Sequence, residues 1–146
     1  MAEDSTEVFS QLLQTLAALG KCIRARLSAE QLSITPDQYA LLNALIVHGA
    51  LTQAELAELY DRERSVVFRQ TDHLEEEQLV SRVADTDDRR KKTLGLTRKG
   101  RQVHDQAQAL TGTFMLELLS ELPATDVETF LRVLRTMRDK AQQLDL

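Results

Sequence analysis

Apolar side chains in the first thirty residues recur at steps of three and four positions. This spacing lines one face of a helix, so it predicts a helix over residues 5–30. At ~1.5 Å per residue such a helix is about 38 Å long, which is more than one small domain covers. We therefore expect a second subunit to pack against its apolar face. The apolar series is Val8, Leu12, Leu16, Leu19, Ile23 and Leu27.

Two capping patterns predict the next two helices. Thr35 and Gln38 can form a capping box, with Pro36 at the first helical position, and Gly49 is placed to end the helix. The run Thr52–Glu55 repeats the pattern and opens a short helix. The expected inward-facing side chains are Tyr39, Leu42, Leu45 and Ile46 in the first of these helices and Leu56, Ala57 and Leu59 in the second.

The middle of the chain changes from helical to strand patterning. A fourth helix is expected from Arg64 to about Glu77, and its inward-facing side chains are Val67, Thr71 and Leu74. Segments 79–84 and 93–96 are short and rich in residues that favour strands, and the highly charged stretch 85–92 lies between them. This arrangement predicts a two-stranded hairpin with an exposed loop.

The last third of the chain returns to helical spacing. Thr97 is expected to cap a fifth helix, and residues 125–128 open a last helix after Pro123. Their apolar series are Val103, Ala107, Leu110, Phe114 and Leu118, and then Phe130, Leu131, Leu134 and Met137. The predicted order is α-α-α-α-β-β-α-α, a mainly α fold with a small β-hairpin, and 146 residues fit a single domain.

The charge of the chain is unevenly distributed. Its net charge is −5, but residues 82–101 contain eight basic and three acidic residues, a local net charge of +5. A solvated charged loop is the usual reading of such a run, so charge alone does not decide between a loop and a nucleic-acid surface.

Composition and the cysteine count indicate a folded protein of the reducing cytoplasm. Hydrophobic residues make up 42% and charged residues 28%, and Cys22 is the single cysteine, so no internal disulfide is expected. The acidic N-terminus lacks the pattern of a secretory signal, and no apolar run approaches the ~20 residues that span a bilayer. We expect no membrane association.

Two short helices followed by a charged hairpin form a recurring plan for DNA binding. The second helix would enter the major groove, where arginine can bind guanine, serine a phosphate or a base edge, and phenylalanine a thymine methyl group. The basic hairpin loop is placed to follow the adjacent minor groove. The outward-facing side chains expected on that second helix are Arg64, Ser65, Phe68, Arg69 and Asp72.

Five short runs carry a specific resemblance in their order and spacing. They are residues 51–59, 64–69 and 74–80, then Asp88-Arg89-Arg90, then Leu96-Thr97-Arg98-Lys99-Gly100. Together they resemble the winged helix-turn-helix of the MarR family of transcriptional regulators. The chain departs from the family pattern at the turn Asp61-Arg62, at Gln78 where glycine is common, and at Phe68, which replaces a usually polar residue.

The resemblance implies a fold, partners and roles for residues. Residues 36–100 would form the winged helix-turn-helix, and residues 5–30 and 101–146 would form a homodimer. The dimer would bind a pseudo-palindromic operator in double-stranded DNA and repress transcription until a small molecule binds between the dimer helices and the winged part. In the family the wing arginine enters the minor groove and a nearby aspartate orients it, roles that fall here on Arg90 and Asp88. The expected DNA-contacting residues are Arg62, Arg64, Ser65, Phe68, Arg69, Asp88, Arg89, Arg90 and Lys91.

Other kinds of site have weaker support. Cys22 lies away from the position near Gln11 where hydroperoxide-sensing relatives carry their reactive cysteine, so we expect it to be unreactive. The three histidines are scattered without ligand spacing, so neither a metal nor another cofactor is expected. No nucleophile motif or glycine-rich phosphate loop occurs, which makes an enzyme the least favoured class. A winged helix used for protein–protein contact is the remaining alternative, and the salt dependence of binding separates it from a DNA-binding protein.

Overall fold

The computed structural model describes residues 2–60, 62–85 and 87–144, and the chain divides into two compact units, Met1–Thr111 and Gly112–Leu146. The elements in chain order are α1 (Ala2–Ala29), α2 (Pro36–His48), α3 (Gln53–Leu59), α4 (Arg64–Glu76), β1 (Val80–Ala84), β2 (Lys92–Leu96), α5 (Arg98–Leu119) and α6 (Ala124–Leu144). The predicted order of helices and strands is confirmed over the described residues.

Both predicted capping boxes are present. The Thr35 hydroxyl accepts a hydrogen bond from the backbone N–H of Gln38 at 3.1 Å, and the Gln38 side chain accepts one from the backbone of Thr35 at 3.0 Å. Thr52 and Glu55 make the same reciprocal pair at 3.1 and 2.7 Å. Gly49 ends α2 with a φ of 77°, a conformation that side chains rarely adopt. The starts of α2 and α3 and the end of α2 are therefore set by residues that are close together in the sequence.

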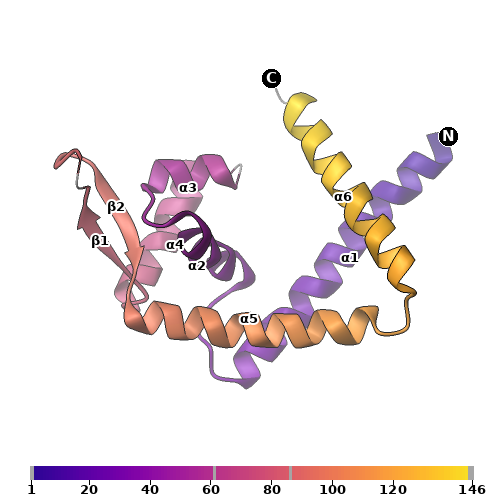
Figure 1. The fold of residues 1–146 in the computed structure, drawn as a ribbon, viewed down its shortest axis with the longest axis horizontal. Coiled ribbons are helices and arrows are strands. Elements are labelled where there is room, and N and C mark those ends of the chain that lie inside the picture. Colours follow the sequence, from indigo (N-terminus) through magenta and orange to yellow (C-terminus); the bar gives the residue numbers. More distant parts are fainter. Residues whose placement is uncertain (1, 61, 86, 145–146) are drawn as a thin grey trace. The chain divides into compact units, whose positions relative to one another are not determined.

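The core of the first unit lies among α2, α3, α4 and the hairpin, which pack side by side (Figure 1). Leu42, Leu56 and Leu74 are fully buried there, together with the end of α1 at Leu27. The prediction that Leu59 faces inward is wrong, since 46% of it is exposed. Because α3 ends at Leu59, the next residue, Tyr60, packs against the core instead, and its hydroxyl donates to the carbonyl oxygen of Ala40 at 2.7 Å.

The hairpin is antiparallel, with Val80 opposite Leu96 and Ala84 opposite Lys92. Leu51 adds a single bridge to β2, because its backbone N–H and carbonyl both pair with Leu94, at 3.2 and 2.7 Å. The buried side chains of Val80 and Leu94 then join the base of the hairpin to the helical core. The hairpin is therefore anchored at its base and exposed at its loop.

The start of α5 packs directly on the chain that enters the hairpin. Thr97 caps the helix as predicted, because its hydroxyl accepts a hydrogen bond from the backbone N–H of Gly100 at 2.9 Å. Gly100 lies so close to Leu79 that a Cβ there would approach the Leu79 carbonyl carbon to 2.8 Å. No side chain fits this position without a shift of backbone.

A buried histidine joins α5 to α2. His104 is 1% exposed, its Nε2 faces Oδ1 of Asn43 at 3.1 Å, and its Nδ1 faces Oδ1 of Asp105 at 3.2 Å. The ring also stacks on Tyr39, with the centroids 5.5 Å apart. This polar contact lies wholly within the first unit and fixes α5 against the helix-turn-helix.

The second unit contains the end of α5 and all of α6. The last helix begins at Ala124, earlier than the predicted start at Thr125, because the carbonyl of Pro123 accepts hydrogen bonds from Asp126 and Val127. None of its described residues is buried. Its exposed large apolar side chains are Phe130, Leu131, Val133, Leu134, Met137 and Leu144.

The N-terminal helix also keeps apolar side chains in solvent. Val8, Phe9, Leu13 and Leu16 of α1 are exposed, and so is Cys22. Exposed apolar faces of this extent mark interaction surfaces in soluble proteins. Among the described helices, none is both long and apolar enough to cross a membrane.

Candidate nucleic-acid interface

Helix α4 has one buried face and one face in solvent. Val67, Thr71 and Leu74 are buried, as predicted from their spacing. The opposite face exposes Arg64, Ser65, Phe68, Arg69 and Asp72. An aromatic ring that is 41% exposed between two arginines on one helix face is placed for contact with a partner.

A polar contact inside the helix-turn-helix fixes α4 against α3. The Gln53 side chain donates to the hydroxyl of Thr71 at 2.6 Å, and that hydroxyl donates to the carbonyl of Phe68 at 3.0 Å. Thr71 is therefore buried with its hydrogen-bonding capacity used. At the other end of α4, the N-cap residue Glu63 makes no capping hydrogen bond with its side chain.

The hairpin loop is held in shape by two aspartates. Oδ1 of Asp85 accepts from the backbone N–H groups of Asp87 and Asp88 at 2.8 and 3.4 Å. These backbone donors, Asp87 first, lower the pKa of the Asp85 carboxyl group. Oδ1 of Asp88 accepts from the backbone N–H of Arg90 at 3.0 Å. Asp88 thus holds the backbone of the loop at Arg90.

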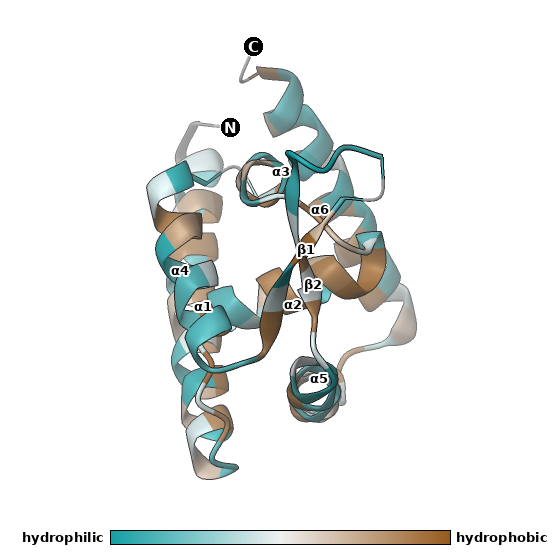
Figure 2. Ribbon diagram, turned by 90° about the vertical axis from the view of Figure 1, so that its left-hand side faces the viewer, coloured by the Kyte–Doolittle hydropathy of each residue, from teal (hydrophilic) through white to brown (hydrophobic). Residues whose placement is uncertain are grey.

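The same loop presents its cations to solvent. Arg89, Arg90 and Lys91 are all exposed, and the loop is hydrophilic in Figure 2. Among the described residues, Arg64, Arg69, Arg89 and Arg90 form no ion pair with a carboxylate. Four guanidinium groups are therefore available to a negatively charged partner.

Lys91 differs from these arginines because it is paired within the chain. Its Nζ lies 3.1 Å from Oε1 of Glu55, whose other oxygen caps α3. The backbone of Thr52 and then the Lys91 ammonium lower the pKa of the Glu55 carboxyl group, and Glu55 raises the pKa of Lys91. Lys91 therefore ties the hairpin loop to α3.

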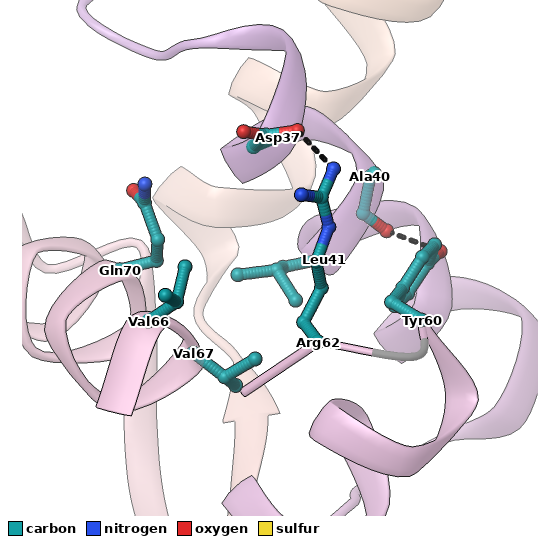
Figure 3. A pocket seen from close by; sticks show the side chains of 8 residues that line it. All are labelled: Asp37, Ala40, Leu41, Tyr60, Arg62, Val66, Val67 and Gln70. Carbon is teal, nitrogen blue, oxygen red and sulfur yellow. Dashed lines mark hydrogen bonds and ion pairs between the residues drawn. The ribbon is translucent and has the colours of Figure 1, made fainter. Parts of the chain in front are cut away.

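Arg62 is also directed toward a carboxylate. It lies on the connection between α3 and α4, and its guanidinium is 3.6 Å from Asp37 at the start of α2 (Figure 3). Arg62 and Asp37 line a cavity of about 50 Å³, together with Ala40, Leu41, Tyr60, Val66, Val67 and Gln70. Cavities that hold drug-sized ligands measure about 300–1,000 Å³, so this one is too small for such a molecule.

The structure groups the nine predicted contact residues in three places. Four lie on the exposed face of α4, four on the hairpin loop, and Arg62 on the connection between helices. One residue that the sequence did not indicate is Arg82 of β1, whose guanidinium binds Asp72 and Glu75 of α4. In the sequence, the only indication of this contact was the pair of carboxylates, which are three positions apart and therefore lie on the same side of one helix. No group of three described side chains has the arrangement of a metal site.

The chain is similar in sequence to known transcriptional regulators. A model of the MarR family matches residues 34–92. The HTH-type transcriptional repressor MdtR of Bacillus subtilis (strain 168) is 31% identical over 122 residues, which are 82% of this chain and 79% of that protein.

Two solved structures are similar over nearly the whole chain. The S. aureus MepR–DNA complex has a TM-score of 0.78 at 25% identity and covers 91% of this chain and 96% of that one. The PcaV transcriptional regulator from Streptomyces coelicolor, solved with its natural ligand, has a TM-score of 0.72 at 26% identity and covers 92% and 91%. The similarity to these two structures extends over the helix-turn-helix, the wing formed by the hairpin, and the flanking helices. The chain belongs to the MarR family.

Proposed function

We propose that this protein is a homodimeric transcriptional repressor that binds an operator in double-stranded DNA. The observation that carries the proposal is the exposed face of α4, whose two arginines have no carboxylate partner among the described residues, together with a wing loop that has two more such arginines. A MarR-family relative solved with DNA and another named as a repressor support it. The protein would act in the cytoplasm, and its function requires binding alone, without a catalytic step.

The two basic elements would divide the recognition of DNA. Helix α4 would lie in the major groove, where Arg64 and Arg69 reach guanine edges and Phe68 contacts a thymine methyl group. Ser65 would bind a phosphate or a base edge. The wing would place Arg90 in the minor groove, whose narrow form attracts arginine, while Arg89 binds phosphate.

The paired cations would contribute less. Lys91 and Arg62 each face a carboxylate at 3.1 and 3.6 Å, so a phosphate must compete with that partner. We propose that both are secondary contacts, and that Asp88 acts by shaping the loop around Arg90.

The dimer would follow from the exposed apolar side chains of α1 and of α6, which a second copy would cover. Dimers are typical of the family. A two-fold dimer presents two copies of α4 to half-sites about 34–36 Å apart, which predicts a pseudo-palindromic operator.

We also propose that a small molecule releases the repressor from DNA. The relative solved with its natural ligand supports this part of the proposal. Linkage requires that such a molecule bind the free protein more tightly than the DNA-bound protein.

The decisive experiment is to capture genomic fragments with the purified full-length protein, sequence them, and measure affinity for the recovered site and for scrambled DNA over a range of salt. Specific binding that weakens steeply with salt supports the proposal. Failure to bind any DNA at low salt would refute the proposal and favour a protein-binding winged helix.

A further inference from the structure

Arg82 lies on the face of the hairpin that meets the helices. In the register of the two strands it stands opposite Leu94, which is buried in the core. Residues directly opposite each other in an antiparallel pair project to the same face of the sheet. The Arg82 side chain therefore lies on the inner side of the wing, beside α4.

Its guanidinium binds two carboxylates of α4 at once. Nε donates to Oε2 of Glu75 at 3.0 Å, and Nη2 donates to Oδ1 of Asp72 at 3.2 Å. Asp72 and Glu75 are three positions apart and so lie on the same side of the helix. A planar guanidinium that donates to two acceptors fixes both the distance and the orientation of β1 relative to α4. A lysine ammonium would fix the distance alone.

The two acceptors belong to the helix proposed to read bases. Asp72 shares the exposed face of α4 with Phe68 and Arg69. Arg82 belongs to the strand that leads into the loop with Arg90. One side chain thus joins the element that would enter the major groove to the element that would enter the minor groove.

Arg82 also offsets an acidic cluster at the end of α4. That end carries four carboxylates, Asp72, Glu75, Glu76 and Glu77. Phosphates repel such charges, and the contact with Arg82 neutralises the two that face the wing.

We propose that Arg82 is a positioning residue for DNA binding: it sets the wing relative to α4 so that Arg69 and Arg90 reach adjacent grooves of one half-site. The inference rests on the proposed function. It differs from two other roles that an arginine here can have, a direct phosphate contact and a contact that stabilises the fold alone.

The test compares the wild type with Arg82→Ala, Arg90→Ala and the double variant. Affinity for the recovered operator is measured at several salt concentrations, and thermal midpoints are recorded for each full-length protein. Arg82→Ala should weaken binding about three- to tenfold, with the salt slope unchanged, because Arg82 releases no counterion from DNA. Arg90→Ala should lower that slope by about one unit.

The double variant is the sharpest readout. In the wild-type background, Arg90→Ala should weaken operator binding by about tenfold. In the Arg82→Ala background it should weaken binding by no more than about threefold, since the wing is already misplaced there. Arg82→Lys keeps the charge but lacks the two-armed geometry, so it should fall between wild type and Arg82→Ala while folding normally.

Three results would overturn the inference. A salt slope reduced by one unit in Arg82→Ala would make Arg82 a phosphate contact. An equal loss from Arg90→Ala in both backgrounds would mean that Arg82 does not position the wing. If Arg90→Ala alone leaves binding unchanged, the proposed role of the wing fails first, and the positioning role fails with it.

Discussion

Gly100 offers the strongest test of how α5 is attached to the wing. A Cβ at this position would lie 2.8 Å from the carbonyl carbon of Leu79 and 3.2 Å from its Cα, and it would come closer still to the carbonyl oxygen. The obstacle is backbone at the base of the wing, so it cannot move aside as a flexible side chain does. Overpacking costs about 1–3 kcal/mol, and we expect Gly100→Ala to reach the upper part of that range.

The intrinsic preference of alanine for helices acts in the opposite direction. Replacing a helical glycine by alanine stabilises a helix by roughly 0.5–1 kcal/mol, so the net loss expected for Gly100→Ala is about 1–2 kcal/mol. For a chain of this size the midpoint of thermal unfolding should fall by about 3–8 °C. Affinity for DNA should fall with it, since the entry to β1 must shift.

Gly112 provides the matched control on the same helix. Nothing lies within 4 Å of the Cβ that alanine would add there. Gly112→Ala should therefore raise the thermal midpoint slightly, while Gly100→Ala lowers it, at one protein concentration for all variants. If Gly100→Ala unfolds at or above the wild-type temperature, α5 does not pack on Leu79 as described.

The remaining predictions concern the DNA surface and the dimer. Arg69→Ala should weaken operator binding by about 1–3 kcal/mol and change the preferred bases, as measured by anisotropy on a panel of substituted operators. Asp88→Ala should weaken binding although it makes the chain less negative, because the Arg90 N–H loses its acceptor. Asp87→Ala, with the same charge change and no such contact, should bind as tightly as the wild type in the same assay. Light scattering at micromolar concentration should give twice the 16.5 kDa of one chain, and a monomer would contradict the proposed dimer.

Much of the fold follows from contacts between near neighbours in sequence. Thr35 caps α2 by accepting from the backbone N–H of Gln38, and Thr52 caps α3 by accepting from that of Glu55. Each contact spans three positions, so the two helix starts were predictable from short motifs. The buried stripe of α4 was equally predictable, because its period is that of the helix itself. Leu59 was assigned to the wrong side because α3 ends there, and the packing of Tyr60 on α2 depends on a contact across twenty positions.

The contacts that shape the candidate site were harder to predict. Lys91 meets Glu55 across 36 positions, and His104 meets Asn43 across 61. No local pattern brings such residues together, because the contact exists only once the core has placed their elements side by side. The sequence therefore predicted a set of candidate DNA-contacting residues, but it did not distinguish the cations that are paired from those that are exposed.

That distinction changes how the charge of the chain relates to DNA binding. Counting residues 82–101 gives a local net charge of +5, but three of the eight cations there bind partners among the described residues. Arg82 binds α4, Lys91 binds Glu55, and Lys99 donates to the carbonyl of Glu77 at 2.9 Å. Two of the three aspartates of the same stretch likewise hold the loop, since Asp85 and Asp88 accept backbone hydrogen bonds.

Among the described residues, the cations of this stretch without a carboxylate partner include Arg89 and Arg90 of the wing loop, and α4 adds Arg64 and Arg69. Arg64 and Arg69 lie outside the basic stretch of the sequence, yet they share with Arg89 and Arg90 the property of having no carboxylate partner among the described residues. Exposed charges farther apart than about 10 Å are largely screened at 0.1 M salt, so DNA responds to this local surface and not to the net charge of −5. An acidic chain can therefore bind DNA when its carboxylates near the interface are used to orient its arginines.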